Sequence, residues 1–285
     1  NLTQAGTAMK QWAKLSPLPV PESTEDFYND FAPYYYGGRV QCFERGIIDT
    51  DFEVVDINSA YPFAMLHKHP YSTNYSDVAG YRRNADFYTV RCISRGAFPY
   101  RGESAGLDFP DDDTVREYTI TGWEYAAALE TGTIENIKVL RSITFISHVD
   151  FSEYVHHFYN ARMACKANGD NAGALIAKGL LTGLYGKFAA NPASYKNHMV
   201  IPLEVAPGLD ALGWTFAGEF GPWGLAESPL DPERRRYYNV STGASITGFV
   251  RAMLWRAICS SDGVLYCDTD SLAVREAGPA VELGD

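Results

Sequence analysis

The sequence lacks any long hydrophobic run. No stretch of about 18 consecutive apolar residues, the shortest that would suggest a membrane span, occurs in the chain, although 46% of its 285 residues are hydrophobic. The start of the chain shows no signal-peptide pattern. Its five cysteines include no C-x-x-C spacing, which favours reduced thiols over disulfides. We therefore expect no membrane contact, and a protein that folds around a substantial core in the cytoplasm or another reducing compartment.

Cations and zinc-ligand patterns are also scarce. Lys and Arg number 24 against 35 Asp and Glu, which gives a formal net charge of −11. Because affinity for nucleic acid comes largely from cations that replace phosphate counterions, this composition opposes a simple DNA-binding protein. The histidine pairs at 67/69 and 156/157 lack the i, i+4 spacing of a helical zinc site.

The most informative pattern that is present is a pair of acids, Asp268 and Asp270. The short apolar runs at 264–267 and 272–274 predict two strands of a hairpin with the acids at its tip. Carboxylates at the end of buried strands are unfavourable unless a cation lies nearby, and oxygen ligands suit Mg²⁺ or Mn²⁺. Taken alone, a D-x-D turn is explained equally well as a solvated surface turn.

A second apolar run ends in another acid, Asp56. The chain then turns, and Pro62 is suited to the opening of a short helix, whereas Tyr61 just before it is expected to be extended. If this strand lies beside the hairpin, Asp56 converges with Asp268 and Asp270. Such a convergence of carboxylates is what two-metal phosphoryl transfer requires.

Two helices are expected, over residues 152–167 and 172–188, with a break at Gly169. Asp170 or Asn171 is suited to cap the second helix. Three apolar side chains of the second helix recur every four residues, and we expect them to form its buried stripe: Ile176, Leu180 and Leu184.

These helices carry the cations that could receive a triphosphate. Arg162 and Lys166 are four residues apart and share a face of the first helix. On the second helix, Lys178, Thr182 and Tyr185 share a face. A solvated helix surface remains the alternative for Arg162 and Lys166.

In their order along the chain, these patterns resemble motifs A, B and C of family B DNA polymerases. The matching segments are D-x-N-S-x-Y-P from Asp56, K-x-x-x-x-x-x-Y-G from Lys178 and Y-x-D-T-D-S from Tyr266. A Y-x-G-G pattern at residues 35–38 precedes motif A, which is similar to the protein-primed branch of phages and linear plasmids.

The resemblance implies an α+β fold, in which a polymerase palm (an antiparallel sheet backed by helices) carries helical fingers and two insertions. It divides the chain into 1–70, the palm entry with the template-binding motif and motif A; 71–150, the first insertion plus palm strands; 151–190, the fingers with motif B; 191–236, the second insertion; and 237–285, the palm with motif C. The exonuclease and the thumb are not expected within these 285 residues. The chain therefore resembles a palm-and-fingers piece of a longer polymerase, or a reduced relative.

The resemblance also implies roles for single residues. Catalysis is implied for the acids Asp56, Asp268 and Asp270, and binding of two Mg²⁺ or Mn²⁺ ions for Asp56, Asp270 and the Ile57 carbonyl. Nucleotide binding is implied for Ser59, Ala60, Tyr61, Arg162, Lys166, Lys178, Thr182 and Tyr185, with Tyr61 as the ring that excludes a 2′-hydroxyl. DNA binding is implied for Tyr35, Gly37, Gly38, Thr247 and Arg251.

The implied reaction is template-directed transfer of dNTPs to a primer 3′-hydroxyl or to the hydroxyl of a terminal, priming protein, with template and primer DNA as further partners. Two departures weaken the match: Thr182-Gly183 stands where motif B usually has Asn-Ser, and Val250 replaces a small residue in the T-x-x-G/A-R pattern. Two other classes stay open here. One is a polymerase-like module that binds a priming protein or template without catalysis, and the other is a two-metal nuclease.

Overall fold

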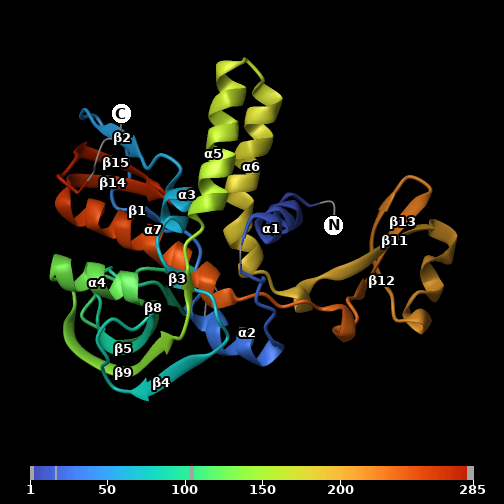
Figure 1. The fold of residues 1–285 in the computed structure, drawn as a ribbon, viewed down its shortest axis with the longest axis horizontal. Coiled ribbons are helices and arrows are strands. Elements are labelled where there is room, and N and C mark those ends of the chain that lie inside the picture. The colour runs from blue at the N-terminus through green and yellow to red at the C-terminus, as the bar shows by residue number, and fades with distance from the viewer. Residues whose placement is uncertain (1–2, 17, 103–105, 281–285) are drawn as a thin grey trace.

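The structure, a computed structural model, describes residues 3–16, 18–102 and 106–280. Figure 1 shows a body of two sheets with helix α7 (Val240–Ser260) running through it, a helical hairpin that extends from this body, and a small sheet held away from it on extended chain. Every strand pairing in these residues is antiparallel. Antiparallel sheets combined with helices are the mixed architecture that the sequence predicts.

The first sheet contains both acidic motifs. Its four strands lie in the order β1 (Val40–Cys42), β14 (Asp262–Asp268), β15 (Ser271–Glu276) and β2 (Glu53–Asp56). Helix α7 covers one face, where Leu254 and Ile258 join the core formed by Cys267 and Val274. The opposite face is open to solvent, since Val54 and Tyr266 are exposed. The acids therefore lie at the end of a sheet that has one face buried against α7 and the other face exposed to solvent.

A second sheet packs on the other side of α7. Its strands lie in the order β4 (Tyr75–Ala79), β9 (Glu135–Phe145), β5 (Phe87–Ile93) and β8 (Arg116–Thr121), followed in the chain by α4 (Gly122–Thr131). Two short pairs flank it: β3 (His69–Pro70) with β10 (His148–Val149), and β6 (Tyr100–Arg101) with β7 (Leu107–Asp108). Helix α2 (Glu25–Phe31) docks on this sheet through Phe27 and Phe31, which pack with Phe87 and Phe145. Since both sheets use α7, that helix is buried on nearly all sides.

The helical hairpin consists of α5 (Ser152–Ala167) and α6 (Asn171–Phe188), as predicted. Asp170 caps α6 by accepting from the Gly173 N–H at 2.9 Å, and Gly169 adopts a left-handed φ of 71° in the turn. Helix α1 (Gln4–Leu15) lies against α6, where Gln4 takes the space that a side chain at position 179 would occupy.

The predicted buried stripe of α6 is wrong in part. Ile176 is 64% exposed and Leu180 is half-buried, and only Leu184 is fully buried. A spacing of four residues turns about 40° around a helix at each step, so the apolar face follows alternating steps of three and four instead. The residues that do form it are Ala174, Ala177, Leu181, Leu184 and Phe188.

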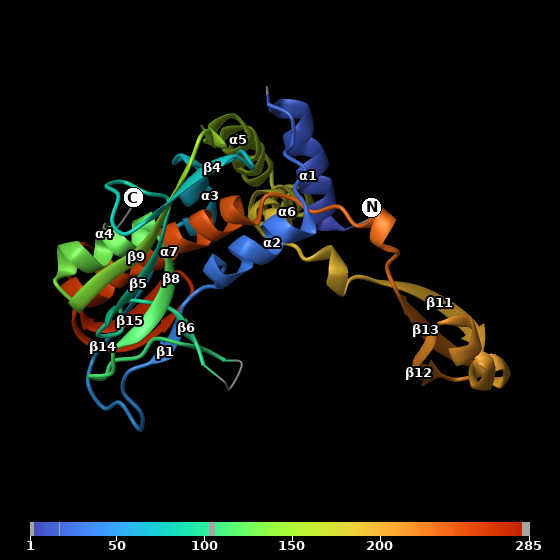
Figure 2. The ribbon, with the colours of Figure 1, turned by 90° about the horizontal axis from the view of Figure 1, so that it is seen from below.

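The small sheet lies within residues 191–236 and stands apart from the body (Figure 2). Its strands lie in the order β11 (Lys196–Pro202), β13 (Trp223–Pro229) and β12 (Thr215–Phe220), and a core of Ile201, Leu209 and Ala226 holds them together. The chain leaves for this sheet after α6 and returns to α7 at the same place. A methyl group at Gly243 would lie only 2.9 Å from the Ala189 Cβ.

None of the helices within residues 3–16, 18–102 and 106–280 is both long and apolar enough to cross a membrane. All five cysteines are free thiols.

Candidate active site

The acids of two distant motifs meet at one end of the first sheet. Asp56 ends β2 and Asp268 ends β14, and both are paired with Ser271, the first residue of the strand between them. The Ile57 N–H donates to the Asp270 carbonyl at 2.8 Å, which ties the turn after β2 to the hairpin tip. The convergence of the two acidic segments is confirmed.

Asp270 lies in an environment that disfavours a single unbalanced negative charge. Its pKa is raised, first because burial disfavours the charged form and then because Asp56 lies nearby, with a smaller contribution from Asp268. Lys178 of α6 acts in the opposite direction and lowers the pKa of Asp270. A cation at this place would relieve the repulsion between the acids, and the hairpin already brings one ammonium group within electrostatic reach.

The oxygen atoms available here fit a hard divalent ion. In the part of the chain that the structure describes, no three Asp, Glu, His or Cys side chains are close enough to hold an ion by themselves. The predicted metal ligands are the Asp56 and Asp270 carboxylates and the Ile57 carbonyl, with Asp268 as an accessory acid, and this assignment stays a prediction. Asp268 accepts a hydrogen bond from the Thr269 hydroxyl at 3.0 Å. The donors that remain, the Asp56 and Asp270 carboxylates and the Ile57 carbonyl, are all oxygen and suit Mg²⁺ or Mn²⁺.

Two predicted nucleotide-binding tyrosines are in direct contact. The rings of Tyr61 and Tyr185 are stacked, with their centroids 4.2 Å apart and an interplanar angle of 3°. Tyr35 of the Y-x-G-G segment lies close enough that its charge would raise the pKa of both, although burial is the larger cause of each rise. Tyrosines from three separate motifs therefore gather beside the acids.

The backbone prediction for Tyr61 is wrong. Tyr61 lies in α3 (Ala60–Met65) rather than in an extended segment, and Ser59 precedes this helix with a left-handed φ of 55°. Pro62 is the third helical residue, and a proline is tolerated there because the first N–H groups of a helix have no partner to lose. Ala60, the first residue of this helix, is buried.

The predicted phosphate-binding cations lie on the hairpin. Arg162 is half-buried, whereas Lys166 and Lys178 are exposed. None of the three forms an ion pair with a carboxylate of the described residues. The Thr182 hydroxyl donates to the Lys178 carbonyl at 3.1 Å. These cations are thus available to an anionic ligand.

Thr247 and Arg251 do not lie where the DNA-binding prediction requires. Both are buried in α7, and Arg251 is only 2% exposed. Its Nε donates to Glu124 Oε1 at 2.7 Å, and its Nη1 donates to the carbonyls of Tyr36 and Gly37 at 2.7 and 2.8 Å. The T-x-x-V-R segment therefore fixes the Y-x-G-G segment from inside and does not present a guanidinium to DNA.

Gly38 is required by a close contact rather than by a turn. A Cβ at this position would lie 2.7 Å from the Thr269 Cγ2 and 3.1 Å from its Cα. The Y-x-G-G segment therefore rests directly on the turn that carries Asp268 and Asp270. The Gly37 side of the segment, by contrast, is exposed.

Two residues with clear structural roles at this site escaped the sequence reasoning, Glu124 and Arg39. The T-x-x-E pattern from Thr121 indicates a capping box, and the Thr121 N–H does donate to Glu124 Oε2 at 2.9 Å. The only sign of Arg39 in the sequence is its position as a charged residue directly after two glycines and before the apolar Val40.

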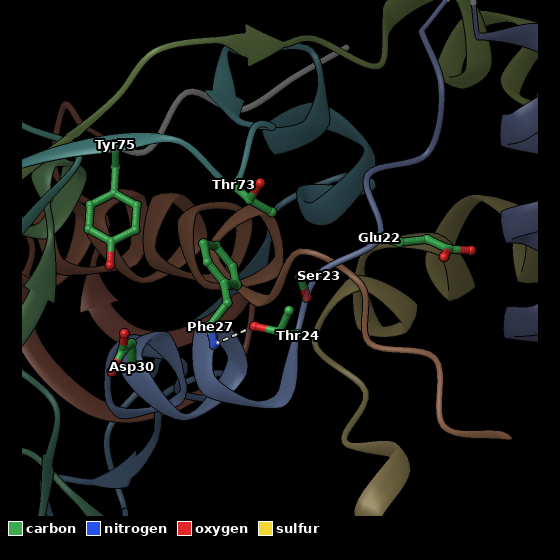
Figure 3. A pocket seen from close by; sticks show the side chains of 7 residues that line it. All are labelled: Glu22, Ser23, Thr24, Phe27, Asp30, Thr73 and Tyr75. Carbon is green, nitrogen blue, oxygen red and sulfur yellow. Dashed lines mark hydrogen bonds between the residues drawn. The ribbon is translucent and has the colours of Figure 1, made fainter. Parts of the chain in front are cut away.

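Two hollows differ in their relation to the acids. One, of about 500 Å³, is lined by Asp56, Asn58 and Asp270 together with Phe63 and Met253, so it opens beside the candidate site. Figure 3 shows the other, of about 300 Å³, whose lining includes none of the predicted site residues. In it the Thr24 hydroxyl accepts from the Phe27 N–H at 3.1 Å and caps α2.

An antiparallel sheet that joins two acidic motifs, next to a helical hairpin that carries cations unpaired in the described residues, is the arrangement expected of the polymerase class. Residues 2–209 match the family described as DNA polymerase type B, organellar and viral. The chain belongs to this family, which confirms the resemblance seen in its motifs.

Two relatives extend this result. The DNA-directed DNA polymerase of Enterobacteria phage PRD1 is 35% identical over 284 residues, a match that covers 97% of this chain and 49% of the relative. A probable DNA polymerase of Agaricus bitorquis is 30% identical over 177 residues, covering 56% of this chain and 21% of that protein. The chain thus spans about half the length of the phage relative.

Solved structures show the same fold. Phi29 DNA polymerase complexed with single-stranded DNA matches all of this chain and 49% of its own with a TM-score of 0.70 at 19% identity. Phi29 DNA polymerase complexed with primer-template DNA and incoming nucleotide substrates gives a TM-score of 0.70 at 19% identity, covering 100% of this chain and 50% of its own.

Proposed function

We propose that this chain carries the catalytic part of a template-directed DNA polymerase, which transfers dNTPs to a 3′-hydroxyl or to the hydroxyl of a priming protein during replication of a viral or plasmid genome. The observation that carries the proposal is the meeting of Asp56 and Asp270 at one end of the first sheet, within electrostatic reach of Lys178. Nucleotidyl transfer needs both oxygen ligands for divalent ions and cations for a triphosphate.

The carboxylates of Asp56 and Asp270 and the carbonyl of Ile57 would hold two Mg²⁺ or Mn²⁺ ions. Bound ions would lower the pKa of the primer hydroxyl and offset charge on the α-phosphate and the leaving pyrophosphate. Asp268, whose backbone carbonyl accepts from the Asp270 N–H at 2.6 Å, would shape the turn and add negative charge beside the pair.

The hairpin would bind the incoming nucleotide. Lys178, Lys166 and Arg162 would hold its phosphates, the lysines as point charges and the arginine as a planar fork. Ser59 and Ala60 would line the sugar side and Thr182 the helix side of the same pocket. No acid of the described residues competes for these cations, which supports this role.

The stacked tyrosines would form the nucleotide pocket. Tyr61 would pack beneath the sugar and exclude a 2′-hydroxyl, and Tyr185 would line the nascent base pair. The contact between the two rings supports a single pocket wall to which both contribute. A pocket closed by two aromatic faces tests the shape of a base pair rather than one base, as templated synthesis requires.

The remaining parts would guide DNA and the priming protein. We assign the first sheet and α7 to the palm, α5–α6 to the fingers, and the second sheet and the small sheet to two insertions that contact a priming protein or template. Tyr35, Gly37 and Gly38 would follow the template strand. The solvent-exposed face of Gly37 and the buried support from Arg251 support this assignment.

The net charge of −11 limits how tightly the chain can hold DNA by itself. Affinity for duplex DNA depends on counterion release by cations. We expect binding weaker than micromolar at physiological salt, as non-specific complexes generally are. Fluorescence anisotropy of a labelled primer-template at increasing protein concentration measures this, and a sub-micromolar dissociation constant would contradict it.

Primer extension tests the function. The assay uses the 285-residue chain, and a chimera in which these residues replace the matching part of the phage PRD1 relative, each with Mg²⁺ or Mn²⁺ and with or without a candidate priming protein. Template-dependent lengthening that is lost in Asp56→Asn and Asp270→Asn is the expected result. Shortened primers in place of lengthened ones would indicate a nuclease. A chimera that is inactive while the intact relative is active would indicate a module without catalysis.

A further inference from the structure

Arg39 is a buried cation next to the turn of residues 268–270, which we call the catalytic turn. It is 1% exposed and ranks among the largest fully buried side chains. Its Nη1 donates to the Gly96 carbonyl at 2.8 Å and its Nε to Gln41 Oε1 at 3.0 Å. No carboxylate of the described residues forms an ion pair with it. A buried cation that lacks a carboxylate is costly, so other contacts must compensate it.

Aromatic rings supply that compensation. The Arg39 Cζ lies 4.2 Å from the centroid of the Phe109 ring and 4.6 Å from that of Trp255. A planar guanidinium can stack on aromatic faces while its edge donates hydrogen bonds, which a lysine ammonium cannot reproduce. Burial lowers the pKa of Arg39 to about 10, so the group stays cationic at neutral pH. The side chain thereby anchors β1 to α7 and to the segment that precedes β8.

The backbone of Arg39 holds the catalytic turn. Its carbonyl accepts the Thr269 N–H at 2.7 Å, and Thr269 is the single residue between the two acids of the hairpin tip. Thr269 adopts a left-handed φ of 59°, a conformation that costs a β-branched residue energy unless its surroundings fix it. Gly38, the residue before Arg39, lies against the same threonine, because a Cβ at this position would be 2.7 Å from the Thr269 Cγ2.

We propose that Arg39 is a positioning residue for the metal-binding acids. The buried guanidinium fixes the three-residue edge strand β1, the carbonyl of Arg39 fixes Thr269, and the turn then holds Asp270 beside Asp56. Arg39 contacts neither the ions nor the nucleotide, and it acts only through the backbone that it anchors. The inference rests on the proposed function, because it takes these acids as the ligands of divalent ions.

Direct Mn²⁺ binding tests the inference without DNA or catalysis. The electron paramagnetic resonance signal of free Mn²⁺ is titrated against the 285-residue chain and its variants. Arg39→Met keeps an unbranched side chain that can pack against the aromatic rings but removes the charge and the donors. We expect its Mn²⁺ dissociation constant to rise about tenfold or more, as for other residues that orient metal ligands. Arg39→Lys keeps the charge without the planar fork, and we expect an intermediate rise.

The matched control is Arg141→Met. Arg141 pairs with Asp77 on the second sheet through Nη2 at 2.6 Å, away from the acids. This variant loses an arginine of equal size and should bind Mn²⁺ as the wild type does. Thermal unfolding of each variant shows whether a loss of stability alone could explain a change in affinity. Arg141→Met breaks an exposed ion pair and should unfold close to the wild type.

The outcomes separate the two proposals. If Arg39→Met folds and binds Mn²⁺ as tightly as the wild type, the inference is overturned and the proposed function stands. If the wild type itself does not bind Mn²⁺, or binds it equally well after Asp270→Asn, both are overturned. If Arg39→Met does not fold, Arg39→Lys and Gly38→Ala decide, because a methyl group at Gly38 would lie 2.7 Å from the Thr269 Cγ2 and displace the turn without changing Arg39. Unchanged affinity in both of these variants overturns the inference.

Discussion

The phenol rings of Tyr61 and Tyr185 lie face to face, 4.2 Å between centroids and 3° from parallel. One ring comes from α3 and the other from α6, so the stack joins the acidic end of the first sheet to the helical hairpin. Burial raises the pKa of Tyr61 and Tyr185, so both phenols are neutral at physiological pH and can stack without repulsion.

The proposed role of Tyr61 beneath the sugar predicts that this residue controls the choice of sugar. Replacing it by valine removes the ring on which a deoxyribose would rest, and room for a 2′-hydroxyl appears. We expect Tyr61→Val to lower the preference for dGTP over GTP by about 10- to 200-fold, the range that one lost packing contact supports. The ratio of kcat/KM for the two nucleotides, measured by primer extension, gives the value.

Tyr61→Phe is the control for this change. It keeps the aromatic face and removes only the hydroxyl, so the sugar preference should remain near that of the wild type. An unaltered preference in Tyr61→Val would show that the ring packs in the core without reading the sugar.

Asp270 should lower stability while it supports catalysis. Its raised pKa means that the folded state binds the proton more tightly than the unfolded state, so the unfolding free energy falls as pH rises from the ordinary value of 3.8 through the raised pKa. Asp270→Asn cannot ionise. In EDTA, we expect it to match the wild type near pH 4 and to exceed it at pH 7, as measured by urea unfolding.

In Asp270→Asn the rate of nucleotidyl transfer should fall about a thousandfold, as it does when other electrostatic groups that act on the transition state are removed. Asp51→Asn, in the exposed loop before β2, is the control and should leave the rate unchanged. A variant Asp270→Asn that is destabilised at pH 7, or that extends primers normally, would contradict this account of the acid.

The buried pair of Arg251 and Glu124 predicts a large stability effect. Both side chains are 2% exposed and are joined at 2.7 Å, so Glu124→Gln leaves an uncompensated buried cation. We expect a loss of about 3–5 kcal/mol in the free energy of unfolding. In the double variant with Arg251→Met the two losses should not add, because the same contact cannot be lost twice.

The control for this pair is the exposed ion pair of Arg91 and Glu117, whose side chains are 56% and 51% exposed. Glu117→Gln should cost no more than about 1 kcal/mol. Urea denaturation of the four variants and the wild type gives the comparison, and equal losses for Glu117→Gln and Glu124→Gln would show that burial does not decide the effect.

The corrected stripe of α6 predicts opposite results for two apolar residues of one helix. Leu184 is fully buried, and Leu184→Ala should cost about 2–5 kcal/mol. Ile176 is largely exposed, and Ile176→Lys should change stability by about 0.5 kcal/mol or less. Urea unfolding distinguishes this from the sequence-based stripe, under which Ile176→Lys would be the more damaging change.

Local patterns in the sequence predicted the elements well. The apolar runs around Asp268 and Asp270 predicted the hairpin, and Asp170 and Gly169 marked the start of α6 and the break before it. Each of these depends on residues near one another in the chain, where propensity and capping act directly. The order of the motifs then predicted the meeting of β2 with the hairpin, which a periodicity argument alone could not place.

Long-range packing decided what the sequence could not. Arg251 resembles a DNA-binding residue in its motif. Its side chain is buried instead because it pairs with Glu124, which is far away in the chain and comes into contact only when α4 packs on α7. Tyr61 was expected to be extended because of Pro62, but the helix forms because its first N–H groups need no partners. Arg39 carries no local signal for its contacts with Phe109 and Trp255, which come from other elements.

The contact between Ala189 and Gly243 has an evolutionary consequence. A segment that departs from and returns to a single point can be lengthened, trimmed or exchanged between lineages while the flanking helices keep their places. The small sheet can therefore change in length without moving the strands that carry the acids, whose ends set how Asp56 and Asp268 face each other across Ser271.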